Sequence, residues 1–179
     1  SAFGGRTYEY PSEDPIIAGT MSAQVVNGAA ENGVYAYMKH FAMNEQETNR
    51  WIMICTWSNE QAMRELYLKP FEICVKNSNI TATMSSFNYI GNVWAGGNYE
   101  LQTTLLRDEW GFNGVVVSDW GGVHNTGQAI YNGLDMEFGS WTNGLSTGTR
   151  NAYDNYYQAY PYLKLIKEGK AGTKELDAK

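Results

Sequence analysis

Short apolar runs alternate along this chain with longer amphipathic stretches, and this alternation limits the folds that the chain can adopt. The most strand-like run is Val115-Val116-Val117, and three successive β-branched residues suit a strand that is buried on both faces. Such strands occur in parallel sheets that are covered by helices. The pattern therefore predicts an α/β fold assembled from βα units.

About four strand–helix units are expected. Apolar residues at helical spacing predict a first helix over 16–30, with Gly33 positioned to stop it. Ser58 and Gln61 fit a capping box for a second helix, which Pro70 should kink or divide, and Asn98 can cap a third. We expect strands over 34–38, 80–85, 115–117 and 133–137, an irregular loop over 139–149, and a final helix over 153–167 that ends at Gly169.

Four units are about half of what a closed parallel barrel requires. An eight-stranded (β/α)8 barrel of the TIM type typically takes ~250 residues, whereas this chain has 179. We therefore expect residues 1–179 to form a half-barrel without a second domain. Its open strand edges should favour pairing with another copy or with the rest of a parent protein. The chain starts without Met in a Gly-rich turn, which suggests that something upstream has been removed, and the localisation is not readable.

Composition narrows the possible partners. The formal net charge is −6 and Lys and Arg are not clustered, which argues against a nucleic-acid partner. No apolar run of ~18 residues is available to span a membrane. Thirteen Tyr and six Trp, many beside Asn, Gly or Ser, suit sugar recognition slightly better than an ordinary aromatic core. Cys55 and Cys74 lack metal-ligand spacing and are expected to be free thiols, and neither a metal nor an organic cofactor is expected.

Polar residues at the ends of the predicted strands are the candidates for chemistry, because catalytic groups of parallel α/β folds gather there. Lys39 and His40 stand at the end of the first strand. From spacing alone, a solvated Lys beside a structural His is equally acceptable. Asp119 follows the valine run, where an acid is costly to desolvate unless it has partners or a task. A functional Asp119 is favoured there over a capping one.

Several blocks in the chain resemble glycoside hydrolase family 3, in its β-glucosidase branch. They occur in the family's order and spread over most of the sequence, and the resemblance implies that residues 1–179 are the C-terminal half of the family's N-terminal barrel domain. The block MSSFN at 84–88 departs from the usual MSAYN, because Phe87 replaces Tyr. The remaining blocks are GRTYEY at 5–10 with SEDP at 12–15, KHFA at 39–42 with NEQETNR at 44–50, and RDEWGF at 107–112 with VSDWG at 117–121.

The resemblance implies a set of site residues. Asp119 would be the nucleophile, and Trp120 would help to form a platform for the aglycone. Glu47 would steady the Lys–His pair. Nearby cations would keep Asp119 ionised. The implied sugar-binding residues are Arg6, Lys39, His40, Met84 and Phe87.

The general acid is the missing part of this implied site, because the family draws it from a second domain that this chain does not reach. Glu109 and Glu137 match non-catalytic family positions and are expected to be structural. The N-acetylhexosaminidase branch is disfavoured, since Ala42 and Asn44 replace its Pro-Gly segment. His124 is then expected to be a loop histidine without a catalytic role.

The implied function is a retaining β-glycoside hydrolase, an exo-acting β-glucosidase that releases terminal glucose through a covalent glycosyl-aspartate intermediate. A β-xylosidase or an exo-β-glucanase of the same family is the enzymatic alternative. The other alternative is a catalytically incomplete fragment that binds sugar or serves a structural role. The isolated chain is expected to be inactive, and its expected ligand is a β-linked glucoside or oligosaccharide.

Overall fold

The computed structural model describes residues 4–139 and 152–179. Its centre is a parallel sheet of three strands in the order β1-β3-β6. These are Tyr37–Phe41, Ala82–Ser85 and Val115–Val117. Spatial order follows chain order, as expected for consecutive βα units. The α/β class and the parallel sheet are confirmed, whereas a closed barrel is not formed by the described residues.

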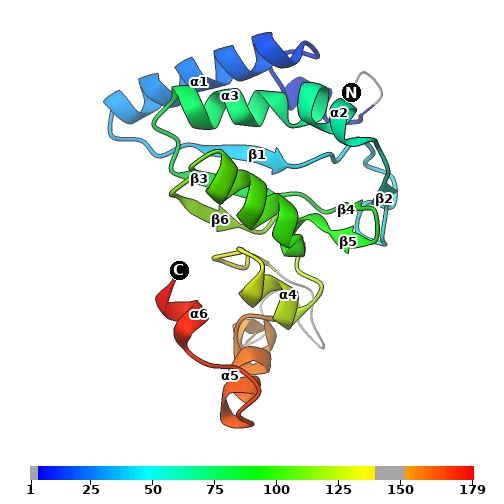
Figure 1. Cartoon of the computed structure of the whole chain (residues 1–179), viewed down its shortest axis with the longest axis vertical. Coiled ribbons are helices and arrows are strands. Elements are labelled where there is room, and N and C mark those ends of the chain that lie inside the picture. Colours follow the sequence, from blue (N-terminus) through cyan, green and yellow to red (C-terminus); the bar gives the residue numbers. More distant parts are fainter. Residues whose placement is uncertain (1–3, 140–151) are drawn as a thin grey trace.

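Helix α1 spans Pro15–Glu31 and confirms the first predicted helix. Asp14 caps it, because its side chain accepts the backbone N–H groups of Ile16 and Ile17 at 2.8 and 2.9 Å. Pro15 suits the first turn, where its missing N–H costs nothing. Gly33 follows the helix with a φ of 73°, a conformation that glycine adopts readily. In Figure 1, α1 and α3 run side by side along one face of the sheet.

The second helical region is divided as Pro70 predicts. Helix α2 (Glu60–Ala62) continues into the π-helical turn η2 (Met63–Tyr67), and α3 (Lys69–Asn77) follows with Pro70 in its first turn. The predicted capping box is off by one residue. The cap is Asn59, whose side-chain oxygen accepts the N–H of Ala62 at 2.8 Å.

Strand β1 begins three residues later than the apolar pattern predicts. Val34 and Tyr35 are exposed, and buried positions begin only at Met38, so the segment that can pair within the sheet is shifted. Its pairing with β3 is irregular between Met38 and Phe41. The Lys39–His40 and Phe41–Ala42 peptide bonds are cis. Lys39 and His40 are thus part of the strand, near its carboxyl end.

The third predicted helix appears as the π-helix η4 (Glu100–Glu109), preceded by the 3₁₀ turn η3 (Ala95–Gly97). Asn98 caps it as predicted, because its side-chain oxygen accepts the N–H of Leu101 at 3.1 Å. A second, smaller sheet was not predicted. It consists of β2 (Cys55–Thr56), β4 (Tyr89–Ile90) and β5 (Val93–Trp94) in the order β2-β4-β5.

The fourth predicted unit is weaker than expected. Residues 133–137 form no strand, and only Met136 makes an isolated parallel bridge, to Val117. Most of the predicted loop over 139–149 lies outside the described residues. The final helix α5 covers Tyr160–Lys167 rather than 153–167, because Pro161 fits the first turn of a helix and sets its start. The other elements are η1 (Thr7–Glu9), α4 (Thr126–Tyr131), η5 (Ala152–Asn155) and α6 (Lys174–Asp177).

The core lies between the sheet and its covering helices. Phe41 packs edge-on against Phe71 and Trp110, at ring-centroid distances of 5.2 and 5.9 Å. Cys55 and Cys74 are free, as predicted. Within the described residues, no helix is long and apolar enough to cross a membrane. Figure 1 shows α4, α5 and α6 grouped at the end of the molecule opposite α1.

Candidate active site

The carboxyl edge of the β1-β3-β6 sheet brings together candidate residues that are far apart in sequence. Met84 on β3 pairs with Val117 on β6, and β1 ends opposite Ser85. Asp119 follows two residues after Val117. Ser118, between Val117 and Asp119, holds the chain where it leaves β6, because its Oγ accepts the backbone N–H of Phe138 at 2.8 Å. The residues expected at three strand ends therefore share one edge of the sheet.

Asp119 is the buried acid of this edge, with only 7% of its surface exposed. Its Oδ1 accepts the backbone N–H of Trp120 at 2.7 Å. Its Oδ2 lies 3.4 Å from Nε2 of His40 and has no hydrogen-bond partner within the described residues. One carboxylate oxygen is thus held by the backbone, whereas the other accepts no hydrogen bond from the described residues.

The electrostatics of Asp119 combine burial with the expected nearby cations. Burial raises the pKa of Asp119 above its usual value, because desolvation disfavours the charged form. The backbone N–H of Trp120 and the charges of Arg50, Arg6 and Lys39 lower the pKa but do not fully offset burial. The cations therefore offset part, but not all, of the rise in the pKa of Asp119 that burial causes.

His40 is held on its other side by Tyr10. The phenol oxygen lies 2.8 Å from Nδ1 of His40 and accepts the backbone N–H of the same residue at 3.3 Å. Burial and the positive charges of Lys39 and Arg6 lower the pKa of His40 to about 3, so the ring is neutral near pH 7. The tautomer in which Tyr10 donates to Nδ1 has the ring proton on Nε2, the nitrogen that lies 3.4 Å from Asp119 Oδ2.

Glu9 bridges the two cations that the resemblance assigns to sugar binding. Its carboxylate accepts two bonds from the Arg6 guanidinium, at 2.6 and 2.8 Å, and one from Lys39 Nζ at 2.7 Å. These partners, with Arg6 first, lower the pKa of Glu9 to about 2 despite its burial. Glu9 and Tyr10 lie within the GRTYEY block, but our sequence analysis gave them no role. Their partners on β1 are 30 positions away.

Glu47 lies in the long segment after β1 and contacts different partners from those expected. Its carboxylate lies 2.9 Å from the Arg50 guanidinium and accepts the side-chain N–H of Asn44 at 3.0 Å. The acid in contact with Lys39 is Glu9 instead. Glu47 thus positions Arg50, a cation near Asp119 that sequence analysis did not single out although it quoted the block containing it.

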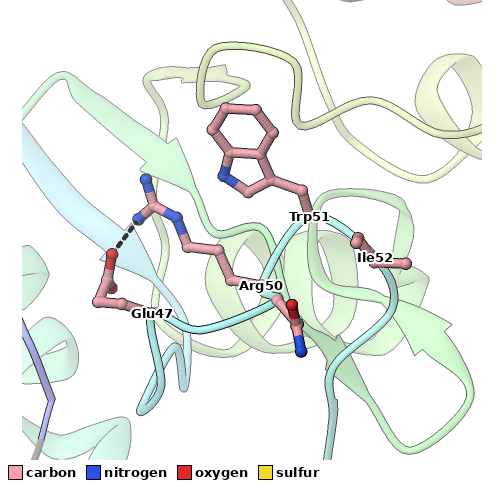
Figure 2. Close-up of a pocket in the computed structure, with 5 residues that line it drawn as sticks. Glu47, Arg50, Trp51 and Ile52 are labelled. Atoms are coloured by element: carbon pink, nitrogen blue, oxygen red, sulfur yellow. Dashed lines mark ion pairs between the residues drawn. The ribbon is translucent and has the colours of Figure 1, made fainter.

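Phe87 lies beneath the side chains of this segment. It is 2% exposed, the Arg50 guanidinium carbon lies 4.4 Å from its ring centroid, and the indole of Trp51 stacks on it at 5.9 Å. Figure 2 shows the Arg50 guanidinium between Glu47 and the Trp51 ring. The ring of Phe87 thus supports Arg50, while its lack of a hydroxyl leaves no donor there.

Trp120 is a second exposed indole near Asp119. Its ring packs against Phe138 at a centroid distance of 5.2 Å, while more than half of the residue remains exposed. A Cβ at Gly139 would lie 2.4 Å from Trp120 Cδ1, so glycine is required for the ring to lie there. Met84 is half-buried at the end of β3.

The remaining acids and the second histidine lie outside this arrangement. Glu109 forms a bidentate pair with Arg64 at 2.7 and 3.0 Å, and Glu137 accepts the backbone N–H groups of Tyr157 and Gln158. Both contacts are of the structural kind that we expected. His124 packs against the rings of Tyr89 and Trp94 in a loop. Among the described residues, no three His, Cys, Asp or Glu side chains are grouped to hold a metal.

Solved β-glucosidase structures resemble this chain. It superposes on β-glucosidase 3B of Thermotoga neapolitana in complex with α-D-glucose with a TM-score of 0.87 and 36% identity, covering 98% of this chain and 24% of that one. A β-glucosidase of Bifidobacterium adolescentis matches with a TM-score of 0.83 and 34% identity, over 97% of this chain and 23% of that one. The described sheet therefore corresponds to part of a glycosidase barrel domain.

Sequence comparison identifies the family. Residues 1–147 match the glycosyl hydrolase family 3 N-terminal domain, and the chain belongs to this family. A β-glucosidase of Bacteroides ovatus is 38% identical over 166 residues, 93% of this chain and 22% of the relative. β-Glucosidase B of Emericella nidulans is 48% identical over 75% of this chain and 16% of the relative. An exo-α-(1→6)-L-arabinopyranosidase of Bifidobacterium longum is 43% identical over 75% of this chain and 18% of the relative. The chain thus spans about a fifth of the length of these relatives.

Proposed function

We propose that this chain supplies the nucleophile and part of the sugar-binding pocket of a retaining, exo-acting β-glucosidase. The observation that carries the proposal is the state of Asp119. The acid is buried at a strand end, and one oxygen is fixed by the Trp120 N–H. The other lies 3.4 Å from His40 Nε2 and has no hydrogen-bond partner in the part of the chain that the structure describes. A buried acid without a complete set of partners is costly unless it serves chemistry.

The free Oδ2 of Asp119 attacks the anomeric carbon of a bound β-glucoside, and the bond to the leaving-group oxygen breaks as the glycosyl-aspartate bond forms. Water then cleaves this ester and restores the carboxylate. Protonation of the leaving oxygen requires a general acid. The family resemblance implies that this acid comes from polypeptide outside these 179 residues. The structural contacts of Glu109 and Glu137 are consistent with that assignment.

The neighbouring groups suit the hydroxyls of the ring that Asp119 attacks. Neutral His40 offers its Nε2 hydrogen as a donor beside the carboxylate. Lys39 and Arg6 are held by Glu9, so their charges are fixed before a ligand arrives. Such pre-orientation lowers the entropy that binding costs. Their charges also favour the ionised form of Asp119, which is the attacking form.

Glucose is the sugar that most of the similar proteins support. The Bacteroides and Emericella relatives are β-glucosidases, and one matched structure holds glucose. A pentopyranose is the second candidate, because an arabinopyranosidase shares 43% identity with the chain. β-Xylosides and longer β-glucans are the substrates of the two enzymatic alternatives and should be tested alongside them. Assays of the complete enzyme on aryl β-glucoside, β-xyloside and α-L-arabinopyranoside, together with a β-glucan, would rank these substrates.

The decisive experiment for the nucleophile uses the complete enzyme. Asp119→Asn should lower kcat by several orders of magnitude, because no glycosyl ester can form. A 2-deoxy-2-fluoro glucoside should label the peptide that contains Asp119. The matched control is Asp108→Asn, an exposed acid on η4, which should keep its activity. A label on another carboxylate would refute the assignment, and sugar binding without any label would favour a non-catalytic role.

The assignment of the sugar-binding residues has its own test. Loss of a charge-assisted hydrogen bond to a hydroxyl costs roughly 1.5–3 kcal/mol. Lys39→Ala should therefore lower kcat/KM by at least about tenfold. His40 is neutral, so loss of its hydrogen bond alone is worth about 0.5–1.5 kcal/mol, and the tenfold loss that we also expect for His40→Ala requires that this bond strengthen in the transition state. Wild-type kinetics in both variants would make them a solvated lysine and a core histidine.

A further inference from the structure

We propose that Phe138 and Ser118 are positioning residues for Asp119, because their contacts hold the chain on both sides of the attacking carboxylate. This inference rests on the proposed function and adds to it the residues that fix where the nucleophile lies. It concerns the short segment 118–122, which follows β6 and contains Asp119, and the segment around Phe138 that packs against it.

Asp119 begins a tight turn of the backbone. Its carbonyl oxygen accepts the N–H of Gly122 at 2.9 Å, which closes a four-residue β-turn. Gly121, the third residue of this turn, has a φ of 77°, a conformation that glycine adopts readily. Within the turn, the Trp120 N–H holds Oδ1 of Asp119 at 2.7 Å. The carboxylate is thus bound to its own turn, and its position depends on where the turn lies.

Phe138 contacts this turn through three of its groups. Its backbone N–H donates to Oγ of Ser118 at 2.8 Å, and its carbonyl oxygen accepts the N–H of Gly121 at 3.0 Å. Its ring packs against that of Trp120 at a centroid distance of 5.2 Å. These partners are the residue before Asp119 and the two residues after it. One residue from a different segment therefore holds the turn on both sides of the acid.

Ser118 supplies the buried side-chain contact of this arrangement. It has no exposed surface, and its backbone N–H donates to the carbonyl oxygen of Met136 at 2.8 Å. Strand β6 ends at Val117, so its pairing with β3 does not depend on the Ser118 hydroxyl. Loss of the hydroxyl should therefore displace the turn that carries Asp119 before it disturbs the sheet.

Phe138 is itself held by contacts that do not involve β6. Glu137, the preceding residue, is buried and accepts the backbone N–H groups of Tyr157 and Gln158 at 3.1 and 2.7 Å. The side chain of Gln158 in turn donates to the carbonyl oxygen of Leu134 at 3.2 Å. The structural contacts of Glu137 thus help to fix the residue against which the nucleophile turn packs.

Such placement affects attack more than it affects sugar binding. Attack requires reacting atoms about 3–3.5 Å apart, and a misplacement of about 1 Å can cost on the order of 100-fold in rate. The proposed sugar-binding residues Arg6, Lys39 and His40 lie on other segments and do not depend on Phe138. A displaced turn should therefore lower the rate of attack while leaving the affinity for the sugar nearly unchanged.

The experiment measures attack separately from binding in the complete enzyme. The probe is 2,4-dinitrophenyl 2-deoxy-2-fluoro-β-glucoside. Asp119 Oδ2 bonds to its anomeric carbon as dinitrophenolate leaves, and this leaving group needs no protonation. Ser118→Ala and Phe138→Ala should each lower the rate constant for labelling by about fivefold to tenfold and change the binding constant of the probe by less than about twofold. Phe138→Tyr, which keeps the ring, should restore most of the rate.

Thr83→Val is the matched control. Thr83 is also fully buried, and its Oγ1 donates to the carbonyl oxygen of Met38 at 3.0 Å, within the same sheet but away from the turn. This variant should lose stability, as Ser118→Ala does, yet label at the wild-type rate. If Ser118→Ala does not fold, Phe138→Ala carries the test, because this residue is only half-buried.

Two results would overturn the inference. Wild-type labelling rates in the alanine variants would mean that these contacts do not place Asp119. An equal loss in Thr83→Val would mean that any weakening of the sheet slows attack. Neither result touches the proposed function, which depends on labelling of Asp119 in the wild-type enzyme. Absence of that label would instead refute the proposed function.

Discussion

The hydroxyl oxygen of Tyr10 contacts His40 twice, through the backbone N–H at 3.3 Å and through Nδ1 of the ring at 2.8 Å. A single phenol therefore fixes both the backbone and the side chain of this histidine. Because the oxygen accepts from the backbone, its own hydrogen is available for Nδ1, and in that tautomer the hydrogen on Nε2 is on the side of the ring that faces Asp119. We expect Tyr10 to act as a positioning residue for His40.

Tyr10→Phe should lower kcat/KM of the complete enzyme by about threefold to tenfold, since the net value of one hydrogen bond is about 1 kcal/mol. A bond to the neutral imidazole disfavours protonation, so its loss should raise the pKa of His40. The titration profile of the His40 ring, followed by NMR, should then move to higher pH. The acidic limb of kcat/KM does not report this change, because Asp119, whose pKa is raised by burial, sets that limb. Tyr8→Phe is the control because Tyr8 is 83% exposed. A lower kcat/KM with an unshifted profile would indicate a packing role only.

Glu9→Gln should change how stability depends on pH. The folded pKa of Glu9 is about 2, below its ordinary value of 4.5. Its stabilisation is therefore fully present above pH 4.5 and is lost as pH falls through about 2. At pH 6 the variant should lose on the order of 1–3 kcal/mol of unfolding free energy, and the difference from wild type should shrink toward pH 2.

Thermal or denaturant unfolding at pH 6, 4 and 2 measures this difference. Glu60→Gln is the matched control, because Glu60 also pairs with an arginine but is largely exposed. Its effect at pH 6 should be within about 0.5 kcal/mol. A Glu9→Gln penalty that does not change with pH would show that the carboxylate stabilises the fold by packing rather than by charge.

Two glycine substitutions should have opposite effects on stability. A Cβ at Gly114 would lie 2.2 Å from the carbonyl oxygen of Thr81, next to the start of β6. Gly114→Ala should therefore destabilise the chain by about 1–3 kcal/mol. Gly28 lies within α1 and a Cβ there meets nothing within 4 Å, so Gly28→Ala should stabilise by about 0.5–1 kcal/mol. Chemical denaturation of both variants tests the pair, and equal effects would contradict the described packing.

Residues 1–179 expressed alone should associate and should not hydrolyse cellobiose. Strand β1 is an edge of the sheet within the described residues, and α1 carries exposed apolar side chains, including Met21 and Val25. Unpaired edges and apolar surface favour association. Light scattering should show oligomers, and Met21→Glu with Val25→Glu should shift them toward the monomer. A monodisperse wild-type monomer that turns over cellobiose would contradict both expectations.

Local chemistry made several elements predictable from sequence. Asn98 caps η4, Pro70 divides the second helical region, and the valine run forms β6, because each feature depends on neighbouring residues. The start of β1 was misplaced by three residues. Val34 and Tyr35 are apolar yet exposed, and an apolar pattern cannot show which of its residues remain at the surface.

Contacts between residues that are far apart in the sequence were harder to predict from the sequence. Glu9 and Tyr10 reach Lys39 and His40 only because η1 lies against the end of β1, and no local pattern encodes that approach. For Glu47 and Arg50 the problem was the opposite one, because their contact is local and was overlooked. Their spacing of three suits a local ion pair, but the resemblance assigned Glu47 to more distant partners. Sequence thus indicated which residues gather at the site better than it indicated which of them touch.

The register of β6 against β3 gives three apolar residues an indirect part in the chemistry. Val115, Val116 and Val117 pair with positions 82–84. A slip of one residue in this pairing would turn every side chain of the strand to the opposite face of the sheet. The free oxygen of Asp119 would then leave the vicinity of His40. An insertion of one residue between Gly114 and Asp119 should accordingly be as damaging to turnover as loss of the carboxylate itself. The backbone hydrogen bonds of an apolar strand thus set the position of the proposed nucleophile relative to His40.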